Sequence, residues 1–278
     1  MKVDLSIIIP AYNEERRLPP TIEKVLEWAD DSVVFNIELI IVDDGSQDDT
    51  RAMVRTFAER DARVRLIEET HVGAMHAIMS GFRAARYELV GNMDADCAVH
   101  PREYERLLPF VSATGIAQGS RVLRDGLPSV ENKSLPRRVL SFFMYRLFIG
   151  LFPIGVHDPQ IGFRLFNRSA VLRIIPLMRL PHDGIKHAEV VVRGFGLGMA
   201  ITEIPVPYIH DEDSRCVPKS PVKMATTALA AAWAVLTMWG QVAVDYHRGI
   251  LSRCPVRLAA IFRPFAGCRG TGPERGGV

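Results

Sequence analysis

The chain has 278 residues, 48% of them hydrophobic, which is enough for one α/β core with appendages. Lysine and arginine (34) nearly balance aspartate and glutamate (32), so the chain has no strong global field and we expect no nucleic-acid partner. The four cysteines form no C-x-x-C pair, which argues against a zinc site or a disulfide framework and favours a reduced, cytosolic location.

The first hundred residues alternate short apolar runs with helix signals. The run Leu5–Ile9 predicts a buried strand that Pro10 ends, and we expect no signal peptide before it. Pro19 and Pro20 then mark the start of a helix with one apolar face. A second apolar run, Ile37–Val42, predicts another buried strand.

Polar residues follow this second strand. We expect Ser46 to cap a helix whose first turn carries Asp48 and Asp49, because acidic side chains interact favourably with a helix N-terminus. The remaining predicted elements are a strand at Val64–Ile67, a helix at about Gly73–Ala85 and a strand at Leu89–Met93. This alternation predicts an α/β fold with a mostly parallel sheet and helices on both faces.

Three polar segments follow predicted strands, and they should meet at one edge of the sheet. The segments are P-A-Y-N-E (residues 10–14), D-D-G-S (43–46) and D-A-D (94–96). Ligands of open α/β sheets bind beyond the carboxyl ends of the strands. Each segment alone is equally well explained as an ordinary strand-to-helix turn with polar caps. Acids at several neighbouring strand ends, however, repel one another unless a cation or hydrogen-bond donors lie among them.

Asp94 and Asp96 stand one residue apart where the apolar run V-G-N-M ends. Once the chain leaves its extended register, both carboxylates can turn towards one divalent cation. Carboxylate oxygens suit Mg²⁺ or Mn²⁺, and a nucleoside diphosphate would complete the coordination. We therefore predict a Mg²⁺ or Mn²⁺ site here, with a common surface turn as the alternative explanation of Asp-x-Asp.

Several longer motifs occur along the chain in a fixed order. They are S-I-I-I-P-A-Y-N-E-E (6–15), I-I-V-D-D-G-S-Q-D-D-T (40–50), M-D-A-D (93–96) and Q-G-S-R (118–121). With them the chain resembles the family 2 glycosyltransferases of GT-A fold over about residues 4–220. Three further motifs make it similar to polyprenyl-phosphate sugar synthases of the dolichyl-phosphate β-glucosyltransferase type: H-D-P-Q-I-G-F-R-L-F-N-R (157–168), T-E-I-P-V (202–206) and H-D-E-D-S-R (210–215).

The resemblance implies a role for each matching residue. The residues implied in nucleotide binding are Pro10, Ala11, Tyr12, Glu14, Asp43 and Asp94, and Asp94 would also hold the metal with Asp96. Those implied in contacts with the acceptor phosphate or the donor phosphates are Arg121, Arg137, Arg138, Ser141, Gln160, Arg164, His210, Ser214 and Arg215. Guanidinium groups suit phosphate oxygens, although each arginine alone is more often a solvated surface charge.

The implied reaction moves a hexose from a UDP- or GDP-sugar to a polyprenyl phosphate with one inversion, and Asp94, Asp96, Arg121 and Asp158 are the residues implied in catalysis. A phosphate monoester, with a second pKa of about 6, is largely anionic near neutral pH and needs no strong base. If a hydroxyl of a small molecule or polysaccharide were the acceptor, Asp158 would serve as the base. A third possibility is a catalytically silent nucleotide-sugar-binding protein, because the chain departs from relatives at Gly73–Met75 and Cys97.

Two apolar segments predict attachment to the cytoplasmic side of a membrane, either peripheral or weakly integral. Val139–Val156 carries Arg146 as its only charge and predicts an interfacial helix, with a buried core helix as the alternative. Ala225–Val244 has no charged residue, and we expect it to lie on the bilayer or pack on protein rather than span. The resulting domains are a catalytic domain over 1–220, a membrane-associating region over 221–266 and a disordered tail over 267–278.

Overall fold

The computed structural model describes residues 2–111, 115–121, 135–179, 185–209 and 221–256, and of residues 135–141, 186 and 221–225 it describes the backbone. The strands are β1 (Val3–Ala11), β2 (Phe35–Asp44), β3 (Val64–Glu69), β4 (Leu89–Asn92), β5 (Ile116–Ser120), β6 (Arg164–Asn167) and β7 (Ile201–Pro205). The α-helices are α1 (Leu18–Asp31), α2 (Thr50–Arg60), α3 (Ala74–Ala84), α4 (Glu103–Leu107), α5 (Leu135–Leu151), α6 (Arg168–Ile174), α7 (Lys186–Gly196) and α8 (Pro221–His247). Short 3₁₀ turns follow α4 (η1, Leu108–Phe110) and α6 (η2, Ile175–Leu177).

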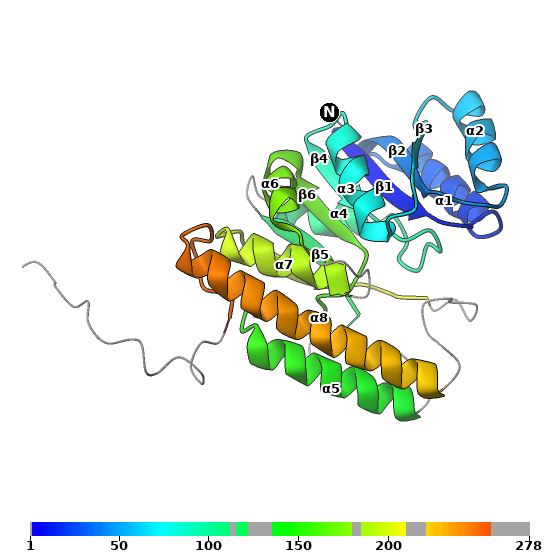
Figure 1. The fold of residues 1–278 in the computed structure, drawn as a ribbon. Coiled ribbons are helices and arrows are strands. Elements are labelled where there is room, and N and C mark those ends of the chain that lie inside the picture. Colours follow the sequence, from blue (N-terminus) through cyan, green and yellow to red (C-terminus); the bar gives the residue numbers. More distant parts are fainter. Residues whose placement is uncertain (1, 112–114, 122–134, 180–184, 210–220, 257–278) are drawn as a thin grey trace, which may run out of the picture.

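The strands form one sheet in the order β3-β2-β1-β4-β6-β5-β7 (Figure 1). Strands β1 to β4 run parallel, as the alternating pattern predicted. Strand β6 is antiparallel to both of its neighbours, β4 and β5, while β5 and β7 run parallel to each other. The mostly parallel sheet is therefore confirmed, and β6 brings the 157–168 motif next to the D-A-D turn.

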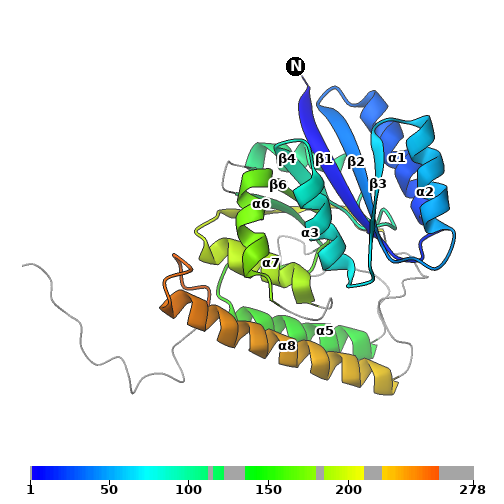
Figure 2. The same cartoon turned by 45° about the horizontal axis from the view of Figure 1, so that its top comes forward.

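Helices cover both faces of the sheet, as predicted (Figure 2). On one face α1, α2 and α4 pack against alternate strand residues, such as Ile7 and Leu39. On the other face α3, α6 and α7 pack against the residues between them, such as Ile8 and Ile40. Because successive side chains of a strand point to opposite faces, strands covered on both sides read as continuous apolar runs.

The prediction that Pro10 ends the first strand is wrong, since β1 continues to Ala11. The Ile8 carbonyl accepts a hydrogen bond from the Met93 N–H (3.1 Å), so the backbone polar groups of Ile8 point towards β4. Pro10 lies two residues later in the strand, so its backbone nitrogen points to the same side. Strand β4 has already ended at Asn92. A proline is tolerated there because its missing N–H removes no ladder bond.

The helix after β2 begins later than predicted. Helix α2 starts at Thr50, so Asp48 and Asp49 precede it, and Asp49 makes no side-chain cap. The Asp48 carboxylate instead accepts hydrogen bonds from the Thr50 N–H (3.0 Å) and hydroxyl (2.5 Å). Ser46 does not cap the helix, because its hydroxyl accepts a bond from the Asn13 N–H (2.9 Å). A contact between two loops thus replaces the expected local cap.

Helices α5, α7 and α8 enclose a separate hydrophobic core beside the sheet, and α5 and α8 lie side by side in both views (Figures 1 and 2). Its buried members include Phe148, Val191 and Met238. Residues Thr226–His247 of α8 also form a helix long and apolar enough to cross a membrane. Large apolar side chains of α5 and α8 that remain exposed are Phe142, Phe143, Leu229, Trp233, Leu236 and Val244. Both apolar segments therefore pack on protein on one side and present apolar groups on another.

The proposed division at residues 220 and 221 remains a prediction. Helix α8 begins at that point, yet it shares a core with α5 and α7. The predicted tail, 267–278, lies outside the described residues.

Candidate active site

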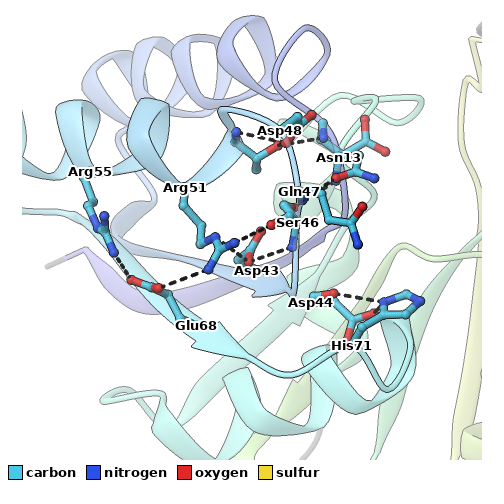
Figure 3. A network of polar contacts seen from close by, with 12 residues as sticks. Asn13, Asp43, Asp44, Ser46, Gln47, Asp48, Arg51, Arg55, Glu68 and His71 are labelled. Carbon is cyan, nitrogen blue, oxygen red and sulfur yellow. Dashed lines mark hydrogen bonds and ion pairs between the residues drawn. The ribbon is translucent and has the colours of Figure 1, made fainter.

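The loops after β1 and β2 are bonded to each other at the carboxyl edge of the sheet (Figure 3). Asn13 has a left-handed backbone with φ 55°, donates its N–H to Ser46, and accepts a bond from the Gln47 N–H at its Oδ1 (2.8 Å). The Glu14 N–H donates to the Thr50 hydroxyl (2.8 Å). The P-A-Y-N-E and D-D-G-S segments therefore meet, as predicted.

Two aspartates end β2 and differ in what they bind (Figure 3). The Asp44 carboxylate accepts hydrogen bonds from the backbone N–H groups of residues 72 and 73, so both of its oxygens already have partners within the protein. Asp43 accepts the Ser46 N–H at Oδ2 (3.0 Å), and Arg51 Nε lies 3.5 Å from the same oxygen. Asp43 Oδ1 is buried and has no hydrogen-bond partner among the described residues. Buried acceptors are normally bonded, so this oxygen suits a donor from a ligand such as a nucleobase N–H.

An aromatic pair stands beside these aspartates. The rings of Tyr12 and His71 are stacked, with centroids 4.1 Å apart and an interplanar angle of 22°. His71 Nδ1 also lies 2.9 Å from Asp44 Oδ2 and 3.0 Å from the Asp44 carbonyl oxygen, and these contacts hold the imidazole in place. Tyr12 is exposed and so presents an aromatic surface of the kind on which nucleobases stack.

The other residues predicted to bind the nucleoside have different surroundings. Pro10 and Ala11 are the last residues of β1, and Ala11 lies level with Asp43 across the parallel pair. The Glu14 carboxylate is taken up by Arg17, whose Nε donates to it at 2.7 Å. A nucleoside hydroxyl would have to share this carboxylate with the guanidinium.

Asp94 and Asp96 lie in the turn that follows β4. The Thr21 hydroxyl of α1 donates to the Ala95 carbonyl (2.7 Å), which ties the turn to the first helix. Cys97, with φ 50°, donates its N–H to the Asp94 carbonyl (3.3 Å) and closes the turn. These contacts fix the backbone of the turn, and Asp94 and Asp96 lie close enough for the charge of Asp96 to act on the pKa of Asp94.

The charges around Asp94 suit a bound cation. Burial and the charge of Asp96 raise the pKa of Asp94 to about 6, against the lowering effect of Arg121 and Arg164. Among the described residues no group of three or more histidine, cysteine, aspartate or glutamate side chains forms a metal site. The protein would thus supply two carboxylates, those of Asp94 and Asp96. Two neighbouring carboxylates fit Mg²⁺ or Mn²⁺ if a diphosphate and water supply the remaining oxygens.

Arg121 and Asp158 form a bidentate ion pair. Arg121 donates from Nε to Asp158 Oδ2 (2.8 Å), from Nη2 to Oδ1 (2.7 Å) and from its backbone N–H to Oδ2 (2.9 Å). Burial raises the pKa of Asp158, but the hydrogen bonds and charge of Arg121 outweigh it, so the net shift is downward. A carboxylate bound in this way is a poor proton acceptor, and the arrangement does not favour Asp158 as a general base.

Tyr208 belongs to the same region, although no sequence motif pointed to it. The Arg121 guanidinium lies over its ring, 5.3 Å from the centroid. Burial raises the pKa of Tyr208 to about 12, and the charges of Asp94 and Asp96 act in the same direction. The next residue, Ile209, donates its N–H to the Ala98 carbonyl (2.9 Å) just beyond the D-A-D turn. Tyr208 is therefore a neutral phenol that backs Arg121 near the aspartates.

Glu203 was also missed, and it positions the Arg121–Asp158 pair. Its carboxylate accepts bonds from the N–H groups of His157 (2.7 Å) and Asp158 (2.8 Å), and from Gln118 Nε2 (3.1 Å). Gln118 and Glu203 lie level with each other in the parallel β5–β7 pair. The available signal was an acid inside the otherwise apolar T-E-I-P-V strand, which requires buried donors.

The remaining predicted residues are distributed as follows. Arg164 begins β6 and is buried beside Gln118, while Gln160 is partly buried in the preceding segment. Arg137, Arg138 and Ser141 lie on α5, where the structure describes the backbone, and His210, Ser214 and Arg215 lie outside the described residues. The roles of these six residues stay predictions.

Comparison with known proteins decides the family. Residues 6–175 match the model of the family described as Glycosyl transferase family 2. The chain belongs to glycosyl transferase family 2. A dolichyl-phosphate beta-glucosyltransferase of Trichomonas vaginalis is 31% identical over 242 residues, covering 83% of this chain and 73% of that protein. A polyprenol monophosphomannose synthase of Mycolicibacterium smegmatis is 29% identical over 253 residues, covering 88% and 90% respectively.

Solved structures share the fold of this family 2 glycosyltransferase. Glucosyl-3-phosphoglycerate synthase from Mycobacterium tuberculosis, in complex with Mn²⁺, UDP and phosphoglyceric acid, has a TM-score of 0.56 at 19% identity, covering 86% of this chain and 79% of that one. Mannosyltransferase from Pyrobaculum calidifontis, in complex with GDP-Man and Mn²⁺, has a TM-score of 0.52 at 19% identity, covering 89% and 76%. The predicted GT-A type of α/β fold is confirmed.

Proposed function

We propose that this glycosyltransferase moves a hexose from a nucleoside-diphosphate sugar to a polyprenyl phosphate. Relatives named for dolichyl-phosphate and polyprenol monophosphate chemistry support the acceptor class. The Arg121–Asp158 ion pair carries the proposal from the structure, because it occupies the carboxylate that a hydroxyl acceptor would need as its base. An acceptor that is already an anion needs no such base.

The transfer is a single displacement at the anomeric carbon. An acceptor phosphate oxygen forms the new bond as the bond to the nucleoside diphosphate breaks, so an α-linked donor gives a β-linked product. Arg164, whose bonded partners are neutral, acts on Asp94 through space and places positive charge where negative charge develops on the departing diphosphate. Arg121 also acts on Asp94, but the bonded carboxylate of Asp158 offsets its charge. The chain's own contribution is thus binding, orientation and charge stabilisation.

Asp94 and Asp96 would hold Mg²⁺ or Mn²⁺, which supplies Lewis-acid stabilisation of the leaving diphosphate. The nucleoside would lie against Tyr12, with the bare Oδ1 of Asp43 accepting a hydrogen bond from the base. Uracil and guanine both present a ring N–H that can donate to this oxygen, so the proposal covers both UDP- and GDP-hexoses as donors.

We further propose that α5 and α8 lie on the cytoplasmic face of a membrane rather than span it. Asp245 of α8 is fully buried and ion-paired with Arg193 of α7 and with Arg179 (3.1 Å). These contacts fasten α8 to the catalytic part of the chain along one side. On the exposed side, apolar groups such as Trp233 can enter the headgroup region.

A transfer assay with matched acceptors tests this function. Purified protein with Mn²⁺ or Mg²⁺ and a panel of UDP- and GDP-hexoses is incubated with a polyprenyl phosphate, the corresponding free polyprenol, or a water-soluble hydroxyl acceptor, and products are identified by mass spectrometry. We expect product with the polyprenyl phosphate and none with the free polyprenol or the water-soluble hydroxyl acceptor. Transfer only to a hydroxyl would show the alternative acceptor class, and nucleotide binding without any transfer would show a silent binding protein.

A further inference from the structure

Arg164 is a buried cation whose hydrogen-bond partners carry no charge. The side chain is 1% exposed. Nε donates to Gln118 Oε1 (3.0 Å), Nη2 donates to the Pro159 carbonyl (2.8 Å), and Nη1 lies 3.1 Å from His187 Nδ1. Burial of a charge without a bonded counter-ion is costly. The carboxylates that act on it do so through space, and of these Asp158 is already bonded to Arg121.

The contact with His187 requires a particular state of the imidazole. A guanidinium only donates, so His187 Nδ1 must be unprotonated to accept from it, and the ring proton must be on Nε2. A protonated ring would place two cations in contact inside the protein. Burial and the charge of Arg164 accordingly lower the pKa of His187 to about 3. His187 therefore orients the guanidinium without neutralising it.

Further contacts hold the elements that carry both members of this pair. His187 lies in the first turn of α7, and that helix is held further along by the buried Arg193, which bonds Glu189 (3.1 Å) and is ion-paired with Asp245. Arg164 follows Gly162 by two residues, and Gly162 directly contacts the Asp94 carboxylate. The Arg164 guanidinium and the Asp94 carboxylate act on each other through space.

We propose that His187 is a positioning residue that holds Arg164 as a standing positive charge for the phosphoryl groups bound at Asp94 and Asp96. The inference rests on the proposed function and adds to it a residue from a helix outside all the motifs. Neutral partners suit this task, because a carboxylate at position 187 would pair with Arg164 and cancel the field that a diphosphate experiences.

The test compares His187→Leu, which removes the acceptor, with His187→Gln, which retains one in a side chain of similar size. Binding of UDP, GDP, uridine and guanosine is measured by calorimetry with Mn²⁺ present. We expect His187→Leu to lose about tenfold in affinity for the diphosphate while nucleoside affinity is unchanged, and His187→Gln to regain most of the loss. Equal losses for nucleoside and diphosphate, or no loss, would overturn the proposal.

A second measurement does not depend on His187→Leu, so it tests the proposal even if that variant does not fold. Nitrogen-15 NMR of histidine-labelled wild-type protein should show one ring unprotonated at Nδ1 and protonated at Nε2 from pH 5 to 8, and its signal should be absent from His187→Gln. An imidazolium or the opposite tautomer at this position would overturn the proposal. Failure of wild-type protein to bind either diphosphate would instead count against the proposed function.

Discussion

The α-carbon of Gly162 faces the carboxylate of Asp94, so that a Cβ at position 162 would lie 2.6 Å from Asp94 Oδ2. Asn92, at the end of β4, holds the backbone of Gly162 in this position by donating from Nδ2 to the Gly162 carbonyl (2.6 Å). The segment before β6 therefore forms the floor under the proposed metal ligand. Only a residue without a side chain leaves room for that carboxylate.

Gly162→Ala should displace Asp94 and reduce transfer about 100-fold, because misplacement of a reacting or metal-binding group by about 1 Å costs that much. Initial rates with saturating donor and acceptor measure the effect, and thermal unfolding confirms that the variant folds. Gly150→Ala on α5 is the control, since a Cβ there meets no atom within 4 Å. Unchanged rates in Gly162→Ala would show that Asp94 has no fixed role.

Asp94→Asn should abolish transfer yet raise the melting temperature of the metal-free protein at pH 7. The pKa of Asp94 is raised to about 6, from about 3.9 in an unfolded chain. The stability that comes from protonated Asp94 is present below pH 3.9 and is lost as the pH rises through 6. The asparagine stays neutral, so its advantage should vanish near pH 4. Melting curves in EDTA from pH 4 to 8 measure this, with exposed Asp31→Asn as the control.

The pH dependence of transfer should follow the acceptor phosphate rather than Asp158. Because the pKa of Asp158 is lowered, its carboxylate is ionised throughout the working range and its pairing with Arg121 is lost only in acid. The rate should therefore rise with pH around the phosphate's second pKa of about 6. Asp158→Asn should lower the rate without moving this inflection. Disappearance of the inflection in that variant would identify Asp158 as a base and favour a hydroxyl acceptor.

Replacing Phe142, Phe143 and Trp233 together by serine should release the protein from anionic vesicles. These side chains are 59%, 64% and 72% exposed, so their loss leaves the core intact. Each contributes about 1.5–3 kcal/mol when fully removed from water, and partial insertion of all three predicts at least a 100-fold fall in partitioning. Vesicle flotation measures it, and Val33→Ser, 86% exposed before β2, is the control. Full retention on vesicles would contradict the proposed orientation.

Point substitutions are preferable to removal of α8. Met238 and Val242 of that helix are buried with α5 and α7, and Asp245 is ion-paired inside the protein. Truncation would therefore expose an apolar core as well as remove the surface under test.

The sequence by itself determined the repeated strands and helices, the family, and the acids at the carboxyl edge of the sheet. These features are local: an apolar run such as Ile37–Val42 marks a buried strand, and Asp94 and Asp96 are neighbours along the chain. Short motifs in a fixed order also identify related proteins without knowledge of any contact.

Only the tertiary structure decided which side chains meet. Pro10 remains in a strand because β4 stops short of it, and Ser46 bonds the neighbouring loop instead of a helix. The pairing of Asp158 with Arg121 and the contact of His187 with Arg164 depend on β6 entering the sheet antiparallel between β4 and β5. Strand order and direction arise from burial summed over the whole sheet, so no local pattern contains them.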